Sequence, residues 1–334
     1  MFYSIIKKCL FCLDPEKAHS VSLFILQKLE KFKIISLLSN TVSNPKKIMG
    51  LIFRNPIGLA AGFDKNGDYI DGLAALGFGF IEIGSITPRP QPGNLKPRLF
   101  RLVNEKAIIN RMGFNNKGVD YLISKLKNTK YKGVLGINIG KNLSTSLDRA
   151  VNDYVLVLKK VMPFATYVTI NISSPNTKGL RDLQSECYLR NMLQSLKKEQ
   201  HEFNKNNNKY VPLLVKISPD LSDSEIQQMA NVFLAEKIDG LIATNTTISR
   251  VEVKTSIHAS EMGGMSGKPL FNSSMNIVKK FSKLLKNEIP IIACGGISSA
   301  SDAKKMIDSG ASLVQIYTGL LYNGPKIINE LAKI

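Results

Sequence analysis

The sequence predicts an α/β fold, a closed (β/α)8 TIM barrel with a small N-terminal helical extension. Short runs rich in Ile, Val and Leu alternate with helix-length segments from about residue 50 to the end of the chain. Each run is too short for a helix and has the composition of a strand in a buried parallel sheet. The length of 334 residues suits one barrel plus a small appendage.

The number of apolar runs favours a closed barrel over an open doubly wound sheet. Each run is followed by a helix-length segment, as a parallel sheet requires. Eight such units fill the chain after its N-terminal segment, and eight strands close a barrel of this type. The predicted strands lie within residues 55–62, 80–85, 133–140, 167–174, 213–218, 240–246, 289–296 and 313–319.

The first forty residues have a different pattern, so we place a boundary between residues 1–40 and 41–334. Apolar residues recur at helical spacing from Phe2 to Leu13, and Asp14-Pro15-Glu16 has the residue types that begin a second helix. We expect that helix to place one apolar row on one side, with further apolar residues widening it. The row is Ala18, Val21, Ile25, Leu29 and Phe32, widened by Leu23, Phe24 and Leu26.

Two interpretations of these helices remain open. They could form a cap packed on the barrel, or an amphipathic pair lying in the interface of a bilayer. Basic residues close to the apolar ones suit the second interpretation, namely Lys7, Lys8, Lys28, Lys31 and Lys33.

The chain is strongly basic, with 45 Lys and Arg against 26 Asp and Glu. This balance suits nucleic acid, an anionic membrane or small anionic ligands. The lysines are scattered over polar helix faces, and no Arg-rich run contains interleaved aromatic residues. A diffusely basic surface is therefore favoured over a nucleic-acid groove.

The cysteines predict neither a disulfide framework nor a metal site. A chain of this length with only Cys9, Cys12, Cys187 and Cys294 is typical of a reducing compartment. Cys9 and Cys12 form a C-x-x-C without a second ligand pair, and we expect both to be buried helix residues. No apolar segment has signal-peptide or transmembrane length, which predicts a protein that is cytosolic or lies on a membrane without crossing it.

Polar residues follow most of the predicted strands, where barrels build their active sites. We expect six of them to converge on one rim and to bind a ligand rich in carbonyl and carboxylate oxygens: Lys65, Asn138, Asn171, Asn176, Lys216 and Asn245. Glycines after the last two strands and at 263–270 suit a phosphate group. No G-x-G-x-x-G follows a strand, which argues against a nicotinamide dinucleotide.

Ten segments carry a resemblance that runs essentially from end to end. They include "GLAAGFDKNG", "INRMGFNN", "GVLGINIGKN", "NISSPNTKGLR", "LLVKISPDLS", "GGMSGKPL" and "GASLVQIYTG". Together they resemble the dihydroorotate dehydrogenase family, class 2, the quinone-reducing and membrane-associated branch. "NRMGFNN" and "NISSPNT" are the most specific, because generic barrel packing would not produce them.

The resemblance implies oxidation of dihydroorotate to orotate in pyrimidine biosynthesis, with bound FMN and a quinone as electron acceptor. Ser174 would be the general base that takes the proton from carbon five, while the hydride leaves carbon six. The implied substrate-binding residues are Lys65, Asn110, Arg111, Met112, Gly113, Phe114, Asn171, Asn176, Asn245 and Thr246. The implied FMN-binding residues are Ala61, Gly62, Phe63, Asp64, Lys65, Ser85, Asn138, Asn171, Lys216, Thr244, Gly267, Gly296, Tyr317 and Thr318.

Further expectations follow from this assignment. A buried Lys216 would stabilise negative charge developing on the reduced flavin. Since a serine is a poor base, Thr177 or a water near Phe114 would help to relay its proton. Residues 176–186 are the candidate lid, Cys294 is expected to be a packing residue, and residues 251–262 look least like the family.

The resemblance also gives residues 1–40 a role in quinone access and membrane contact. It implies a peripheral monomer on the cytoplasmic face of the inner membrane, with no nucleic-acid partner. Two alternatives remain. A soluble class 1 enzyme would carry a cysteine at the position of Ser174, and a flavin-barrel enzyme of the dihydrouridine synthase type would use a cysteine acid.

Overall fold

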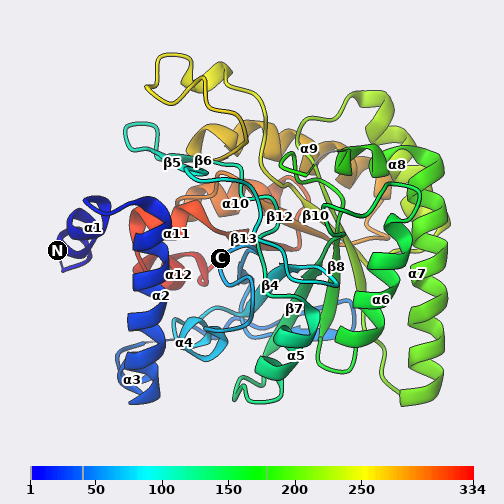
Figure 1. The fold of residues 1–334 in the computed structure, drawn as a ribbon, viewed down its shortest axis with the longest axis horizontal. Helices are drawn as coiled ribbons and strands as arrows, with labels where there is room; N and C mark the ends of the chain where they lie inside the picture. The colour runs from blue at the N-terminus through cyan, green and yellow to red at the C-terminus, as the bar shows by residue number, and fades with distance from the viewer. Residues whose placement is uncertain (1, 40, 178) are drawn as a thin grey trace.

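Eight parallel strands close into a barrel in the computed structural model, which describes residues 2–39, 41–177 and 179–334 (Figure 1). The last strand pairs with the first, with Val314, Gln315 and Ile316 opposite Ile57, Gly58 and Leu59. Each predicted run contains one barrel strand, so the prediction of a (β/α)8 barrel is confirmed. The strands are β3 (Ile57–Leu59), β4 (Phe80–Ile86), β7 (Val134–Ile139), β8 (Tyr167–Asn171), β9 (Leu213–Ile217), β10 (Gly240–Ala243), β12 (Ile291–Cys294) and β13 (Leu313–Ile316).

Helices surround the barrel, and the main core lies between them and the strands. Helix α8 shows why such segments begin where they do, because Ser222 and Glu225 form a reciprocal capping box at its first turn. The outer helices are α4 (Ile70–Ala74), α5 (Val119–Leu126), α6 (Ala150–Val161), α7 (Glu186–Asn207), α8 (Asp223–Ala235), α9 (Phe271–Leu285), α10 (Ala300–Asp308), α11 (Thr318–Asn323) and α12 (Lys326–Leu331).

A hairpin of β1 (Lys46–Ile48) and β2 (Leu51–Phe53) packs at the N-terminal end of the barrel. Phe53 is fully buried there and meets the Phe80 ring edge to face at 5.1 Å between centroids. Phe80 and Val134, each the first residue of its strand, belong to the same apolar cluster. This end of the barrel is therefore filled by side chains, which leaves the C-terminal ends of the strands for the site.

A second small sheet lies over the C-terminal mouth. It is antiparallel and consists of β5 (Leu99–Leu102), β6 (Ala107–Asn110) and β11 (Gly264–Gly267), with β6 in the centre. Asn110 pairs with both Leu99 and Gly264, so the sheet ends at the start of the "NRMGFNN" segment. The sequence patterns did not predict this sheet.

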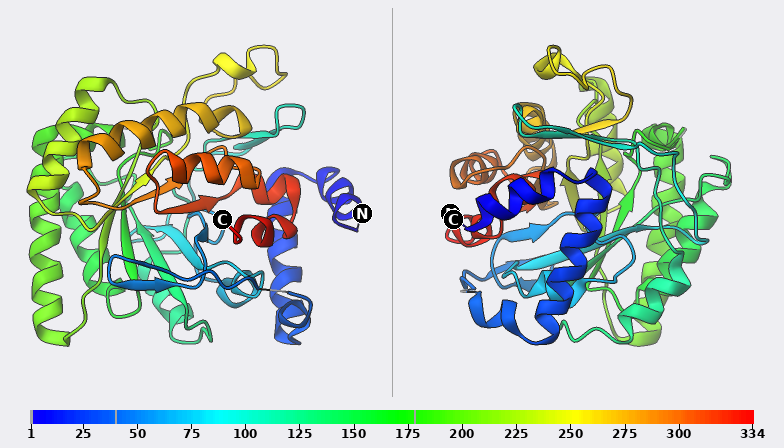
Figure 2. Two further views of the ribbon diagram at one scale, coloured as in Figure 1. Left: turned by 180° about the vertical axis from the view of Figure 1, so that it is seen from behind. Right: turned by 60° about the vertical axis from the view of Figure 1, so that its left-hand side comes forward.

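The N-terminal extension consists of α1 (Phe2–Phe11), α2 (Pro15–Lys31) and α3 (Ile34–Leu38) on one flank of the barrel (Figure 2). The predicted start of the second helix is confirmed, because Asp14 accepts hydrogen bonds from the amides of Glu16 and Lys17 at 3.0 Å. Residue 40, at the predicted boundary, lies outside the described residues. No helix in the described part of the chain is long and apolar enough to cross a bilayer.

These helices are only partly buried, and one expectation about them is wrong. Ala18 and Leu23 are the buried residues of α2, whereas 42% of Val21 and 72% of Phe32 in the predicted row are exposed. Cys9 and Cys12 are also exposed, so the expectation of buried cysteines there is wrong. The reason is that both helices contact the barrel along a narrow strip and leave most of their circumference uncovered.

Candidate active site

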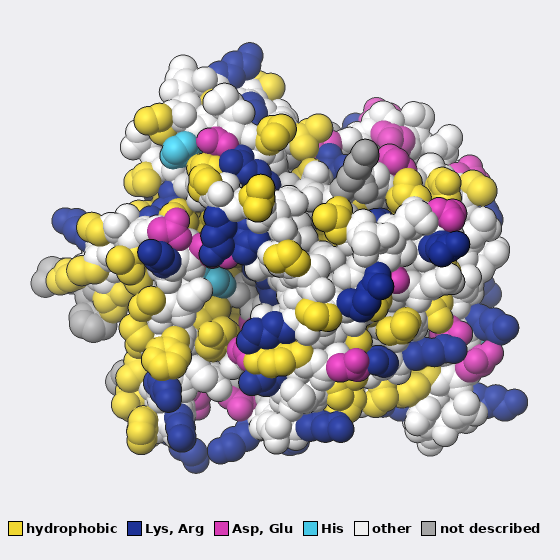
Figure 3. Space-filling view, in the orientation of Figure 1, with side chains coloured by type: hydrophobic (Ala, Val, Ile, Leu, Met, Phe, Trp, Pro, Cys, Tyr) yellow, Lys and Arg dark blue, Asp and Glu magenta, His cyan; other side chains and the backbone are white. Residues whose placement is uncertain are grey.

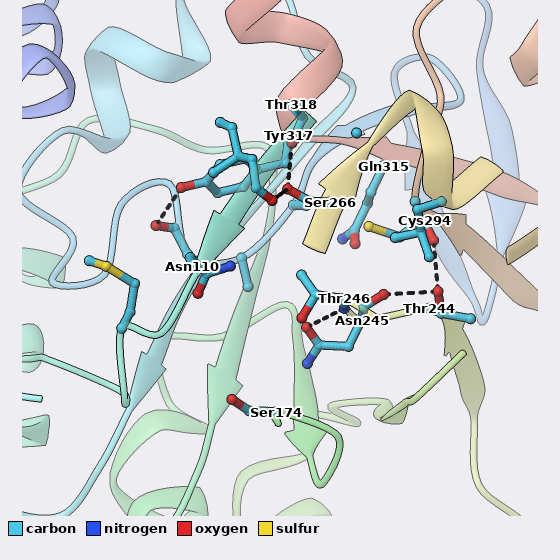
Figure 4. Close-up of a pocket in the computed structure, with 18 of the residues that line it drawn as sticks. Asn110, Ser174, Thr244, Asn245, Thr246, Ser266, Cys294, Gln315, Tyr317 and Thr318 are labelled. Carbon is cyan, nitrogen blue, oxygen red and sulfur yellow. Dashed lines mark hydrogen bonds between the residues drawn. The ribbon is translucent and has the colours of Figure 1, made fainter. Parts of the chain in front are cut away.

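A cavity opens at the C-terminal ends of the barrel strands and encloses about 1240 Å³ with its mouth. Figure 4 shows Ser174 on one side of it, and Tyr317 and Thr318 on the opposite side. Nineteen of the predicted site residues line it: Ala61, Gly62, Lys65, Ser85, Asn110, Met112, Gly113, Phe114, Asn171, Ser174, Asn176, Lys216, Thr244, Asn245, Thr246, Gly267, Gly296, Tyr317 and Thr318.

The floor of the cavity is a network of amides and hydroxyls from adjacent strands. The Asn171 amide donates to Ser85 Oγ at 2.9 Å and to Asn138 Oδ1 at 3.1 Å, and Ser85 Oγ also donates to Asn138 Oδ1. Asn245 Nδ2 in turn donates to Asn171 Oδ1 at 3.3 Å. Asn138 itself does not line the cavity but lies fully buried beneath it. These mutual bonds hold the Asn171 and Asn245 side chains in one orientation at the cavity wall.

Three further predicted residues lie outside the cavity. Phe63 lines a neighbouring apolar cavity instead. Asp64 faces its own loop, where it accepts hydrogen bonds from the amides of Asn66, Asp68 and Tyr69. Arg111 points away, because its guanidinium pairs with Glu261 at 2.6 Å. These three residues therefore lie outside the cavity, while their chain neighbours Gly62, Lys65, Asn110 and Met112 line it.

Lys65 places an ammonium group at the wall of the cavity. Its ammonium donates to the carbonyl of Gly62 at 2.8 Å. Burial lowers the pKa of Lys65 to about 8, although the charge of Glu16 acts in the opposite direction. At neutral pH the ammonium is therefore protonated yet poorly solvated, which makes it a strong binding partner for a carboxylate.

Ser174 lies just after β8 and is 7% exposed. Its hydroxyl oxygen accepts a hydrogen bond from the amide of Asn176 at 3.3 Å. The Asn176 side chain donates to Asn110 Oδ1 at 3.1 Å, which joins the two family-specific segments. The buried Thr177 hydroxyl has no hydrogen-bond partner among the described residues. Two hydroxyls, one accepting a hydrogen bond and one without a partner among the described residues, thus lie within three residues of each other in the sequence.

Two glycines at the other end of the cavity allow close approach of neighbouring backbone segments. Gly296 has a φ of +77°, and a Cβ there would lie 2.4 Å from the backbone of Phe271. Gly267 has a φ of +101°, and a Cβ there would lie 2.3 Å from the carbonyl of Lys106. Only glycine fits such positions without strain. Thr318 completes this part of the wall, with its hydroxyl 2.8 Å from that of Ser266.

The sequence patterns missed three polar residues at the site, Glu82, Ser266 and Gln315. Glu82 is fully buried and accepts hydrogen bonds from Asn138, Tyr167 and Gln315 at 2.8, 2.9 and 2.8 Å. Gln315 lines the cavity, and its Oε1 is buried without a partner in the described chain. A Glu and a Gln inside otherwise apolar strand runs were the available signal.

An apolar cavity of about 1360 Å³ lies beside the polar one, between α1, α2 and the barrel. His19, Leu99, Ile108 and Tyr317 line both cavities. His19 Nε2 lies 2.8 Å from the carbonyl of Phe63, and burial lowers the pKa of His19 to about 4. At neutral pH the partition between the two cavities therefore contains an uncharged imidazole.

The two loops left open by the sequence have defined contacts. In the candidate lid, residues 180–184 form a 3₁₀ helix, and Arg181 donates to the carbonyls of Ser173 and Thr246; residue 178 lies outside the described residues. In the 251–262 segment, Val253 is buried against the small sheet, and the His258 ring packs on Phe100. This segment therefore covers the outer side of the sheet over the mouth.

Comparison with known proteins supports one family. The family described as dihydroorotate dehydrogenase matches residues 44–334. The chain is 52% identical to dihydroorotate dehydrogenase (quinone) of Acinetobacter baylyi, over 99% of this chain and 98% of that protein. It is 50% identical to the protein of the same description from Methylococcus capsulatus, over 100% and 98% of the two chains.

Solved structures agree with this match. A crystal structure of DHODH in complex with ferulenol from Eimeria tenella has a TM-score of 0.87 and 40% identity, covering 96% of this chain and 90% of that one. The ligand-free form from the same organism has the same TM-score and identity, with 93% of that chain covered. With the barrel, the cavity and the family-specific segments all in place, the chain belongs to the dihydroorotate dehydrogenase family.

Proposed function

We propose that this protein oxidises dihydroorotate to orotate in pyrimidine biosynthesis and passes the electrons to a quinone. The observation that carries the proposal is the meeting of Ser174, Lys65 and the amides of Asn110, Asn176 and Asn245 at one cavity. A cation and several amides suit the carboxylate and ring amides of such a substrate. The quinone-named relatives, at about 50% identity over their full lengths, support the same activity.

FMN is the proposed cofactor, and the cavity fits it. Gly267 and Gly296 line the cavity in tight backbone conformations that suit phosphate binding through backbone amides, and Thr318 offers a hydroxyl in the same wall. Lys216 is 5% exposed and lines the cavity, as expected for a cation beside an electron-rich ring. The unpartnered Oε1 of Gln315 is an acceptor for a ligand N–H. When bound, the flavin would accept the hydride from carbon six of the substrate.

The protein residues would bind the substrate and take its proton. Lys65 and the asparagine amides would hold the carboxylate and the ring, so that carbon five faces Ser174. The Ser174 hydroxyl would accept that proton, and the low exposure of the residue excludes the water that would compete. We expect Thr177, whose buried hydroxyl has no partner among the described residues, or a water near Phe114 to relay the proton of the serine.

The role of Ser174 can be tested with Ser174→Ala. We expect the purified variant to keep its yellow flavin spectrum, because the hydroxyl does not contribute to the glycine-lined end of the cavity. Anaerobic bleaching of the flavin by dihydroorotate should slow by about two orders of magnitude or more, the usual effect of losing a general base. Bleaching at the wild-type rate would remove Ser174 from the proposed mechanism.

The apolar cavity is the proposed path for the quinone, and residues 1–40 the proposed membrane contact. Figure 3 shows apolar side chains covering the α1 and α2 flank, with basic side chains nearby. The exposed apolar residues there are Ile5, Ile6, Leu13, Val21, Phe24, Ile25, Phe32, Ile34 and Leu37. Such a surface suits a monomer lying peripherally on the cytoplasmic face of the inner membrane.

Removal of residues 1–40 tests this part of the proposal. We expect the shortened protein to lose both vesicle binding and quinone reduction, because the cavity wall formed by α1 and α2 disappears. Co-sedimentation with anionic lipid vesicles and a quinone-reduction assay measure the two effects. Unimpaired quinone turnover by the shortened protein would contradict the proposed path.

A further inference from the structure

An ion pair joins the N-terminal extension to the rim of the substrate cavity. Glu16, in the first turn of α2, binds Arg98 through both carboxylate oxygens, with N–O distances of 2.7 and 3.2 Å. Arg98 is 7% exposed, and Glu16 lines the cavity. Partial burial acts to raise the pKa of Glu16, but the hydrogen bonds and charges of Arg98 and Lys96 hold it below its ordinary value. A fork-shaped pair at such low exposure fixes geometry as well as charge.

Arg98 also shapes the segment 92–98. Its second terminal nitrogen donates to the carbonyls of Pro92 and Asn94 at 2.7 and 2.9 Å. The Arg98 guanidinium therefore binds the Glu16 carboxylate through one edge and the carbonyls of the 92–94 turn through the other. Gly93, with a φ of +75°, allows this turn to approach Met112, since a Cβ there would lie 2.2 Å from the Met112 carbonyl.

The turn at 92–94 makes hydrogen bonds to both loops that carry the proposed substrate-binding residues. The Asn94 side chain donates to the carbonyl of Arg111 at 2.9 Å and to that of Asn176 at 3.3 Å. The backbone N–H of Asn94 donates to the carbonyl of Met112 at 3.1 Å. One asparagine thus sets the spacing between the 110–114 loop and the loop that carries Ser174.

We propose that Glu16 is a positioning residue for dihydroorotate, which aligns the 110–114 and 174–176 loops through Arg98 and Asn94. The proposal rests on the proposed substrate site at these loops. The proposal gives α2 a second role beside quinone access. The helix forms a wall of the apolar cavity and also positions the loops of the polar cavity. Seating of the N-terminal extension and affinity for the substrate are thereby coupled.

The test uses the full-length, flavin-loaded protein with Glu16→Gln, which keeps the side-chain shape but removes the charge. We expect orotate binding, measured by calorimetry, to weaken about tenfold and the KM for dihydroorotate to rise to match, since a small loop displacement has effects of this size. The KM for a short-chain quinone should stay unchanged. The matched control is Glu30→Gln, which removes the charge of a half-buried acid of α2 that binds Ser36 and does not line the cavity.

A double-mutant cycle tests the path itself. Asn94→Ala leaves the ion pair intact and should weaken orotate binding as much as Glu16→Gln does. The double variant should be no weaker than either single variant, because both changes break one connection. If Glu16→Gln lowers the melting temperature by more than Glu30→Gln does, the orotate affinity of Asn94→Ala alone tests the inference.

Two results would overturn the inference: orotate affinity at the wild-type level in Asn94→Ala, or fully additive losses in the double variant. If Glu16→Gln raises only the KM for the quinone, α2 acts on the apolar cavity alone, and this result would also contradict the inference. Failure of the site assignment is distinguishable, because Lys65→Met should weaken orotate binding in the same assay. If Lys65→Met has no effect, the substrate site itself is misplaced.

Discussion

Raising the pH from 7 to 9 should weaken orotate binding about tenfold. The reason is the buried ammonium of Lys65, whose pKa burial lowers to about 8. Binding of a carboxylate requires the protonated form, so affinity stays level below pH 8 and falls about tenfold for each pH unit above it, or about 1.4 kcal/mol per unit. Near-complete protonation at pH 7 and about one part in eleven at pH 9 give the stated ratio.

Three neighbouring groups have pKa values outside this pH range. The pKa of Asp64 is raised to about 6 and that of His19 lowered to about 4, in both cases chiefly by burial. Burial raises the pKa of Tyr317 to about 12. Of these four groups, therefore, Lys65 is the one whose pKa lies between pH 7 and 9.

Isothermal titration calorimetry in two buffers of different ionisation enthalpy measures both affinity and proton uptake. We expect almost no proton uptake at pH 7 and close to one proton per orotate at pH 9. Lys65→Met is the control: it should bind on the order of 10- to 100-fold more weakly at pH 7, as expected for loss of a charged hydrogen bond, and show no such pH dependence. Equal affinity of the wild type at pH 7 and 9, or a pH dependence retained by Lys65→Met, would refute the reasoning.

Two substitutions test the supports of the site. Gly296→Ala places a methyl group 2.4 Å from the Phe271 backbone at a φ of +77°, which costs roughly 1 to 3 kcal/mol of strain. We expect the purified protein to lose most of its flavin, measured by absorbance. Full flavin content would contradict the proposed binding of the cofactor at this end of the cavity. Asp64→Asn replaces one of the two acceptor oxygens by an NH2 group, so at least one of the backbone amides of Asn66, Asp68 and Tyr69 loses its acceptor. Thermal unfolding should therefore report a loss of about 1 to 3 kcal/mol, and an unchanged melting temperature would count against these contacts.

The barrel could be predicted because its strands are buried on both faces and therefore read as unbroken apolar runs. The run at 55–62 was longer than β3, since Ala60 to Gly62 leave the barrel and line the cavity. The sheet of β5, β6 and β11 could not be predicted from such runs. Its strands have only four residues each, and β6 pairs with β11 across more than 150 positions of sequence, which no local pattern encodes.

The site residues at strand ends could be predicted because parallel strands bring their C-terminal ends together. Side-chain direction was a different matter. Arg111 belongs to a family-specific segment, yet its guanidinium turns to Glu261 in a part of the chain that looked least like the family. Similarly, the apolar circumference of α2 could not indicate that Leu23 would be buried and Phe32 exposed, since both are large and hydrophobic.

The shared partition of His19, Leu99, Ile108 and Tyr317 bears on inhibitor design. A compound bound in the apolar cavity would leave the polar cavity free for the substrate of the proposed reaction. Because the proposed flavin takes electrons from dihydroorotate and gives them to the quinone in turn, such a compound should lower the maximal velocity and the half-saturating dihydroorotate concentration by the same factor. Resistance substitutions at residues that line only one cavity would leave inhibitors of the other cavity effective, whereas substitutions at the four shared residues would change the wall of both.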